Sequence, residues 1–114
     1  MALYLVQHGK CLPKEIDPER GLSEEGIAEV RRIAQVAAVY GCKVGQISHS
    51  GKKRTRQTAE IFKSCLKPQK GVVEISGIDP LDDVAAFSVS LSTEDNLMLV
   101  GHLPFMERLT SYLI

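Results

Sequence analysis

The sequence predicts an α/β fold, a three-layer sandwich in which a mostly parallel sheet is flanked by helices. Residues 2–6 and 96–100 are continuous apolar runs, which are typical of strands buried on both faces. Strand patterns alternate with helical patterns along the chain, and right-handed crossovers between parallel strands place the helices over the sheet. A chain of 114 residues is expected to form a single domain spanning residues 1–114.

The first strand and the first helix have clear signals. Residues 2–6 are apolar throughout, so we expect this strand to be central in the sheet. Ser23 is expected to cap a helix, because Glu24 and Glu25 follow it and carboxylates suit the positive end of the helix dipole. Gly41 should end this helix.

The rest of the chain continues the alternation of strands and helices. The sequence predicts, in order, a strand at 43–47, a helix at 53–66, a strand at 71–75, a helix at 82–91, a strand at 96–100 and a helix from Pro104 to the end. Residues 112–114 are apolar and carry no helix stop signal. We therefore expect either a C-terminally truncated chain or an unusually short natural form of the domain.

The composition excludes several classes of function. Basic and acidic residues number 14 each, so the formal net charge is +0 and no overall field attracts nucleic acid or a membrane surface. No apolar run approaches the roughly 20 residues that a membrane span needs. The 3 cysteines are odd in number and form no CxxC pair, which predicts free thiols and a cytoplasmic location.

Three side chains are predicted to converge at the carboxyl edge of the sheet. His8 follows the first strand and His102 follows the fourth, and open parallel sheets bind ligands outside the carboxyl ends of their strands. Arg54 lies in the first turn of a helix, where backbone N–H groups and a guanidinium together favour an anion. If the first and fourth strands are neighbours, all three side chains can surround one phosphate.

This arrangement predicts nucleophilic phosphoryl transfer without a cofactor or a metal. A neutral His8 would attack the phosphorus, while Arg54 and His102 would neutralise the charge that develops on the equatorial oxygens. Gly9, beside the nucleophile, would allow an abrupt turn and let the backbone approach the oxyanion.

Four segments of the chain resemble motifs of the histidine phosphatase superfamily. They are LYLVQHG at 3–9, similar to LYLVRHG; residues 18–26, similar to RPLTxxG; SGKKRTRQTA at 50–59, similar to SPxxRAxQTA; and VGHLP at 100–104, which matches VGHxP. The resemblance implies a phosphoglycerate-mutase-like fold. Within that fold, the chain length and the VGHLP sequence favour the small phosphohistidine phosphatases of the SixA type. Relatives of this type usually continue into a further C-terminal strand, which this sequence lacks.

The resemblance also implies roles for individual residues. His8 would be phosphorylated during turnover, and Arg54 and His102 would line the phosphate pocket with Gly9 and Gln7. The substrate would be a phosphorylated protein or a small phosphorylated compound. For a phosphohistidine substrate, the reaction would be hydrolysis of a phosphoramidate.

Gln7 departs from the family pattern, which has arginine at this position. A glutamine amide donates hydrogen bonds but carries neither a charge nor a guanidinium fork. Losing a charge-assisted contact to a transferring phosphoryl group costs about two or three decades in rate. Lys10 or Lys52 could supply the missing cation. The alternative is a weakened module that binds phosphate or a phosphoprotein without turning it over.

The general acid is less well defined by the sequence. Asp79 is the candidate, in a loop that also contains Asp82 and Asp83. The latter two fit better as N-terminal residues of the following helix. A phosphoramidate leaving group accepts a proton more readily than an alkoxide, so a phosphohistidine substrate would need such an acid less.

A metal-dependent reaction is the remaining alternative. His8, His49 and His102 could form a three-histidine zinc site with an open position for water. His49 ends the second predicted strand, so the three rings could converge. No HxH or HExxH spacing supports this zinc hydrolase.

Overall fold

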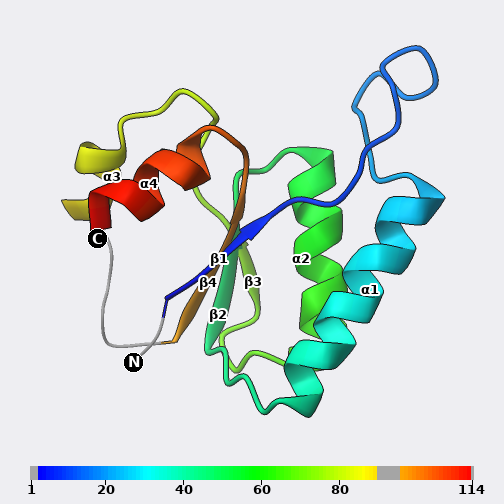
Figure 1. The fold of residues 1–114 in the computed structure, drawn as a ribbon, viewed down its shortest axis with the longest axis horizontal. Helices are drawn as coiled ribbons and strands as arrows, with labels where there is room; N and C mark the ends of the chain where they lie inside the picture. The colour runs from blue at the N-terminus through cyan, green and yellow to red at the C-terminus, as the bar shows by residue number, and fades with distance from the viewer. Residues whose placement is uncertain (1–2, 90–95, 114) are drawn as a thin grey trace.

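The computed structural model describes residues 3–89 and 96–113, and within them it confirms the predicted α/β fold. The strands are β1 (Leu3–Gln7), β2 (Gln46–His49), β3 (Val72–Glu74) and β4 (Leu97–Gly101). The helices are α1 (Glu24–Val39), α2 (Lys53–Leu66), α3 (Val84–Val89) and α4 (Phe105–Leu113). The strands form one parallel sheet in the order β1-β4-β2-β3 (Figure 1).

The sheet is the middle of three layers. Helices α1 and α2 lie over one face, and α3 and α4 lie over the other (Figure 1). Alternate residues of β4 point to the two sides, as a pleated strand requires. Met98 and Val100 belong to the core under α1 and α2, whereas Leu99 belongs to the core that contains Phe105 and Leu109 of α4.

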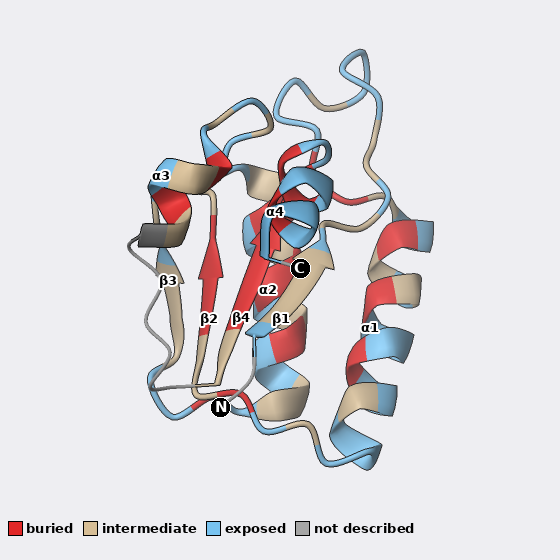
Figure 2. Cartoon of the chain, turned by 60° about the vertical axis from the view of Figure 1, so that its left-hand side comes forward, coloured by how far each residue is buried: buried red, intermediate tan, exposed pale blue. Residues whose placement is uncertain are grey.

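The prediction that the first strand is central is wrong, because β1 lies at an edge of the described sheet. Its only strand partner among the described residues is β4, and β2 and β4 are the most buried strands (Figure 2). The apolar run of β1 reflects cover on its two faces, not pairing along its two edges. Tyr4 and Val6 pack on the core under α1 and α2, while Leu5 packs on the opposite core.

The boundaries of most elements lie within a few residues of those predicted. Helix α2 has the predicted range, and β2 begins three residues later than expected. Helix α3 begins at Val84 because the Asp83 side chain accepts hydrogen bonds from the N–H groups of Ala85 and Ala86. The predicted end of this helix at 91 lies outside the described residues, as do positions 2 and 114 at the two chain ends.

Helix α1 shows why the sequence folds this way locally. Ser23 caps it as predicted, accepting a hydrogen bond of 3.0 Å from the N–H of Gly26. Gly26, Val30 and Ala34 form its buried stripe, and the residues between them are more exposed.

In the described part of the chain, no helix has both the length and the hydrophobicity that a membrane crossing requires.

Candidate active site

The pairing of β1 with β4 brings His8 and His102 together. Gln7 pairs with Gly101 in the register of the two strands, and the N–H of His8 donates to the Gly101 carbonyl at 3.1 Å. The next residue of each strand is therefore a histidine at the carboxyl edge of the sheet. The centroids of the two imidazole rings lie 5.2 Å apart, with the ring planes inclined at 60°.

The tautomer of His8 follows from its backbone contact. Nδ1 lies 2.8 Å from the carbonyl oxygen of Gly9, which can only accept, so Nδ1 carries the proton and Nε2 has a free lone pair. Burial lowers the pKa of His8, and the charges of Arg54 and Arg20 act in the same direction against the opposing Gly9 hydrogen bond. Neutral His8 therefore presents Nε2 as a nucleophilic nitrogen near pH 7.

His102 is more deeply buried than His8, with 2% of its surface exposed. Its Nε2 lies 2.7 Å from the hydroxyl oxygen of Ser50, and its Nδ1 is buried, with no hydrogen-bond partner among residues 3–89 and 96–113. Burial lowers the pKa of His102 to about 4, with further lowering by the charges of Arg54 and His8. This imidazole is therefore neutral near pH 7.

Arg54 lies in the first turn of α2, where the sequence predicts it, and is half-buried. Its charge contributes to the lowered pKa values of His8 and His102, after the larger effect of burial, and it opposes the burial that raises the pKa of Cys11. Thr58 links this helix to the turn after β1, because its hydroxyl accepts from the Gly9 N–H at 3.1 Å and donates to the Arg54 carbonyl at 2.8 Å.

Gly9 has a packing role in addition to the predicted turn. A Cβ atom at this position would lie 2.6 Å from Cγ2 of Val30 in α1 and 3.2 Å from a methyl carbon of Leu22. The contact of 2.6 Å is shorter than real Cβ atoms make, so any larger residue would push the turn after β1 away from α1.

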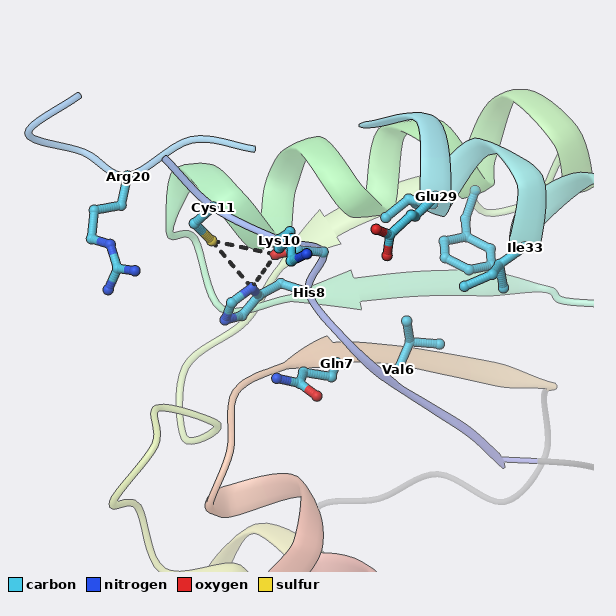
Figure 3. A pocket seen from close by; sticks show the side chains of 11 residues that line it. Val6, Gln7, His8, Lys10, Cys11, Arg20, Glu29 and Ile33 are labelled. Carbon is cyan, nitrogen blue, oxygen red and sulfur yellow. Dashed lines mark hydrogen bonds between the residues drawn. The ribbon is translucent and has the colours of Figure 1, made fainter. Parts of the chain in front are cut away.

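A cavity of about 380 Å³ opens beside His8. In Figure 3, His8 and Cys11 lie near one end of it, and Glu29 and Ile33 lie near the other. Its lining residues are Val6, Gln7, His8, Gly9, Lys10, Cys11, Arg20, Glu29, Val30, Ile33 and Phe62. Arg54 and His102 do not line it. Of the three residues predicted to converge, His8 is thus the one that lines the cavity.

Arg20 and Cys11 are residues of this site that the sequence analysis missed. Arg20 lines the cavity, and its charge lowers the pKa of His8. The sulfur of Cys11 lies 3.4 Å from Nδ1 of His8 and donates to the Gly9 carbonyl at 3.3 Å. Arg20 lies in the segment at 18–26 that is similar to RPLTxxG, and this resemblance is the feature of the sequence that points to it. The spacing of apolar residues indicates neither Arg20 nor Cys11 as a site residue.

The loop that carries Arg20 is fixed to α2 by polar contacts. The carboxylate of Asp17 accepts hydrogen bonds from the N–H groups of Glu19 and Gly21 and forms an ion pair of 2.9 Å with Lys53. Arg20 itself has φ 51°, a left-handed conformation that costs a non-glycine residue energy and needs such support.

Replacing Asp17 with asparagine is expected to destabilise the protein near neutral pH. The Lys53 contact, followed by the backbone hydrogen bonds, lowers the pKa of Asp17 to about 2. A lowered folded-state pKa stabilises the fold above the unfolded value of about 4, and this contribution disappears as the pH falls towards 2. Thermal unfolding should give a lower Tm for D17N near pH 7, and the two melting curves should converge in acid. A constant Tm difference down to pH 2 would contradict this account.

The candidate cations near Gln7 differ in their surroundings. Gln7 is exposed and lines the cavity. The ammonium of Lys10 also lies at the cavity but forms an ion pair of 3.1 Å with Glu25, and both side chains are exposed. Lys52 is exposed at the N-terminus of α2, where its charge makes the smallest contribution to the lowered pKa of His102. Arg20 is a further cation at the cavity.

The three aspartates of the loop before α3, Asp79, Asp82 and Asp83, differ in their contacts. The carboxylate of Asp83 caps α3, as expected for a helix N-terminal residue, whereas Asp82 lies before the helix and its carboxylate accepts from the N–H of Asp79 at 2.8 Å, closing a turn. Asp79 is exposed, and its charge raises the pKa of His102 against the larger effects of burial and nearby cations. Asp79 is thus the loop carboxylate whose charge acts on the site.

His49 does not join the other histidines as the zinc alternative requires. It is buried at the end of β2, where its Nδ1 accepts a hydrogen bond of 3.0 Å from the N–H of Gly51. Within residues 3–89 and 96–113, no group of three or more His, Cys, Asp or Glu side chains is arranged to hold a metal ion. The predicted three-histidine geometry is therefore not found.

Solved structures with this fold include several SixA proteins. A protein assigned as phosphohistidine phosphatase SixA from Agrobacterium tumefaciens is 29% identical, with a TM-score of 0.81 over 98% of this chain and 74% of that one. A protein histidine phosphatase SixA solved with tungstate is 24% identical, with a TM-score of 0.84 over 97% and 75% of the two chains. Phosphoglycerate mutase from Plasmodium falciparum is 17% identical, with a TM-score of 0.65 over 96% and 66%.

Sequence comparison alone does not find these relationships. No family model matches the chain, and no curated protein matches it in sequence. The structural match covers nearly the whole chain, and the relatives at 24% and 17% identity share the fold. The chain therefore has the fold of the histidine phosphatase superfamily, and SixA phosphohistidine phosphatases are among its structural neighbours.

Proposed function

We propose that this protein is a phosphatase that works through a phosphohistidine intermediate on His8. The observation that supports this most strongly is the pairing of a neutral His8, with Nε2 free, and a second imidazole 5.2 Å away at the same sheet edge. Arg54 supplies positive charge to both rings. The SixA relative that shares this fold was solved with tungstate, an oxyanion, which agrees with an anion site in this superfamily.

The proposed reaction has two displacement steps. Nε2 of His8 attacks the phosphorus, a P–N bond forms to His8, and the bond to the leaving group breaks. Water then attacks the phosphorus of the phosphohistidine, which releases phosphate and regenerates neutral His8. Arg54 and His102 stabilise the charge on the phosphoryl oxygens in both steps, and Arg20 adds a cation on the cavity side.

Within this reaction, we propose a phosphohistidine side chain of a protein as the substrate. The cavity of about 380 Å³ beside His8 has room for an imidazole leaving group, and its wall includes the apolar side chains of Val30 and Ile33. A phosphoramidate nitrogen takes up a proton readily, so the exposed Asp79 or a water molecule suffices as the acid. The SixA relatives are phosphohistidine phosphatases by name, which agrees with this substrate class.

The test of this function is chemical trapping of the intermediate. The protein is incubated with phosphoramidate or an aryl phosphate, quenched in alkali, and digested for mass spectrometry. We expect an acid-labile, alkali-stable phosphate on the peptide that contains His8. A phosphate mapped to another residue, or no adduct together with no hydrolysis, would refute the proposal.

The pH dependence of the first step follows from the environment of His8. Because burial lowers its pKa, the nucleophile stays neutral until the pH falls below the usual value of about 6.5. The rate of adduct formation from an aryl phosphate should therefore be flat between pH 7.5 and 6.5 and should decline at lower pH. A decline centred above pH 6.5 would show that His8 is not in the desolvated environment described here.

The Q7R variant tests whether the missing arginine limits the rate. A guanidinium at the end of β1 would add a charge-assisted contact to the phosphoryl group, and we expect adduct formation to become about tenfold faster. The gain is smaller than a full phosphate contact because Arg20 already supplies a cation at the cavity. Tight phosphate binding by the native protein, with no turnover in either form, would instead favour the binding module.

A further inference from the structure

Two hydroxyl groups connect His102 to the N-terminus of α2. The hydroxyl of Ser50 lies 2.7 Å from Nε2 of His102 and 3.0 Å from the hydroxyl of Thr55. Thr55 is completely buried, and its hydroxyl donates to the carbonyl of Lys52 at 2.8 Å. The chain of contacts therefore runs from the helix backbone through two side chains to the imidazole.

The donors and acceptors in this series of hydrogen bonds together assign the tautomer of His102. The Lys52 carbonyl can only accept, so the single hydroxyl proton of Thr55 is directed to it. The Thr55 oxygen then accepts the proton of Ser50, and the Ser50 oxygen in turn accepts from Nε2 of His102. Nε2 is thus protonated, and Nδ1 holds a lone pair.

The opposite orientation of these hydrogen bonds, with donors and acceptors exchanged, is less favourable. If Thr55 donated to Ser50 and Ser50 donated to Nε2, the proton of neutral His102 would sit on Nδ1. Nδ1 is buried, and the described residues provide no acceptor for it. The reversal would also give up the 2.8 Å hydrogen bond to the Lys52 carbonyl. Buried N–H groups without an acceptor are rare in proteins because they lose their hydrogen bonds to water.

We propose that Ser50, supported by Thr55, is a positioning residue that holds His102 as a neutral hydrogen-bond donor through Nε2. This N–H points to Ser50, just before the helix turn that carries Arg54. The inference rests on the proposed function, because an oxygen of the phosphoryl group would take the Nε2 proton in place of the Ser50 oxygen. Ser50 thereby keeps the donor in place before substrate arrives, which is electrostatic preorganisation.

The low basicity of His102 agrees with this role. Burial, with the nearby Arg54 and His8, lowers its pKa to about 4, so the imidazolium form is scarce near pH 7. In the unliganded protein, neutral His102 is therefore the form that meets an incoming phosphate at that pH. The neutral tautomer with its proton on Nε2 supplies the hydrogen bond without proton uptake.

Nitrogen NMR of the unliganded, full-length protein tests the assignment directly. With ¹⁵N-labelled histidine near pH 7, we expect His102 to show a protonated Nε2 and an unprotonated Nδ1. The S50A variant should populate both tautomers, and T55V should shift the population in the same direction, whereas T55S should resemble the native protein. A native protein with the proton on Nδ1 would overturn the inference, as would an unchanged tautomer ratio in both S50A and T55V.

Rates of adduct formation on His8 provide the second readout. We expect S50A to be about tenfold slower, which corresponds to one well-placed hydrogen bond, with T55V slower and T55S close to the native rate. Thermal unfolding of each variant checks that it is folded, and T55V replaces S50A if the latter unfolds. The NMR result needs no substrate. In the native protein, an absent adduct with the proton on Nε2 of His102 would therefore refute the proposed function, whereas a native protein with the proton on Nδ1 would refute the role of Ser50.

Discussion

The H8A variant is expected to form no phosphoenzyme and to show no hydrolysis of a phosphoramidate above background. The proposed reaction passes through a P–N bond to Nε2 of His8, and alanine offers no nucleophile at that place. His102 cannot take over this role, because its Nε2 is occupied by Ser50 and its Nδ1 is buried. The measurement is the phosphate content of the quenched protein together with steady-state release of phosphate.

H49Q is the matched control for this variant. His49 is a buried histidine at the end of β2, on the far side of β4 from β1, and a glutamine oxygen can still accept the hydrogen bond from the Gly51 N–H. We expect this variant to form the adduct on His8 at close to the native rate. An H8A protein that still carries acid-labile phosphate would contradict the assignment of the nucleophile.

The R54A variant is expected to slow phosphorylation of His8 by about a hundredfold to a thousandfold, the usual cost of removing one group that stabilises transition-state charge. The charge of Arg54 lowers the pKa values of both imidazoles, so removing it changes the electrostatics at the proposed phosphate site. R54K should recover part of the rate, since an ammonium keeps the charge but not the fork of donors. Rapid-quench kinetics with an aryl phosphate would measure both variants.

R56A provides the comparison within the same helix. Arg56 lies in α2 two residues beyond Arg54 and is exposed, and its charge acts on His49 instead of the two site histidines. We expect R56A to retain the native rate of phosphorylation. Equal losses in R54A and R56A would mean that general positive charge on α2, and not the position of Arg54, drives the reaction. The basicity of His8 and His102 should also rise in R54A, which a pH titration followed by NMR would detect.

The fold was predictable because its strongest signals are local. The apolar runs of β1 and β4 and the pattern of α2 are visible in the sequence, and the capping residue Ser23 is used as expected. The edge position of β1 could not be predicted in the same way. An apolar strand indicates only that its faces are covered, whereas its order in the sheet depends on long-range pairing with β4.

The site was predictable only in part, for a related reason. Strand ends and a helix N-terminus locate His8, His102 and Arg54, because the parallel sheet brings these points to one edge. Arg20 enters from a loop whose left-handed residue and Asp17 contacts depend on the folded protein. The tautomers of the two histidines depend on single hydrogen bonds from neighbours, which no spacing in the sequence reveals.

The ion pair between Asp17 and Lys53 has a consequence for substrate recognition. Lys53 precedes Arg54 directly, and Asp17 belongs to the short turn that ends at Arg20, so the pair couples the backbones that carry both arginines. The spacing of the two backbone segments that carry Arg20 and Arg54 is thus held by Asp17 and Lys53, in advance of any ligand. Recognition of a ligand by the two arginines would therefore start from this held backbone spacing, to which residues that need not touch the ligand contribute.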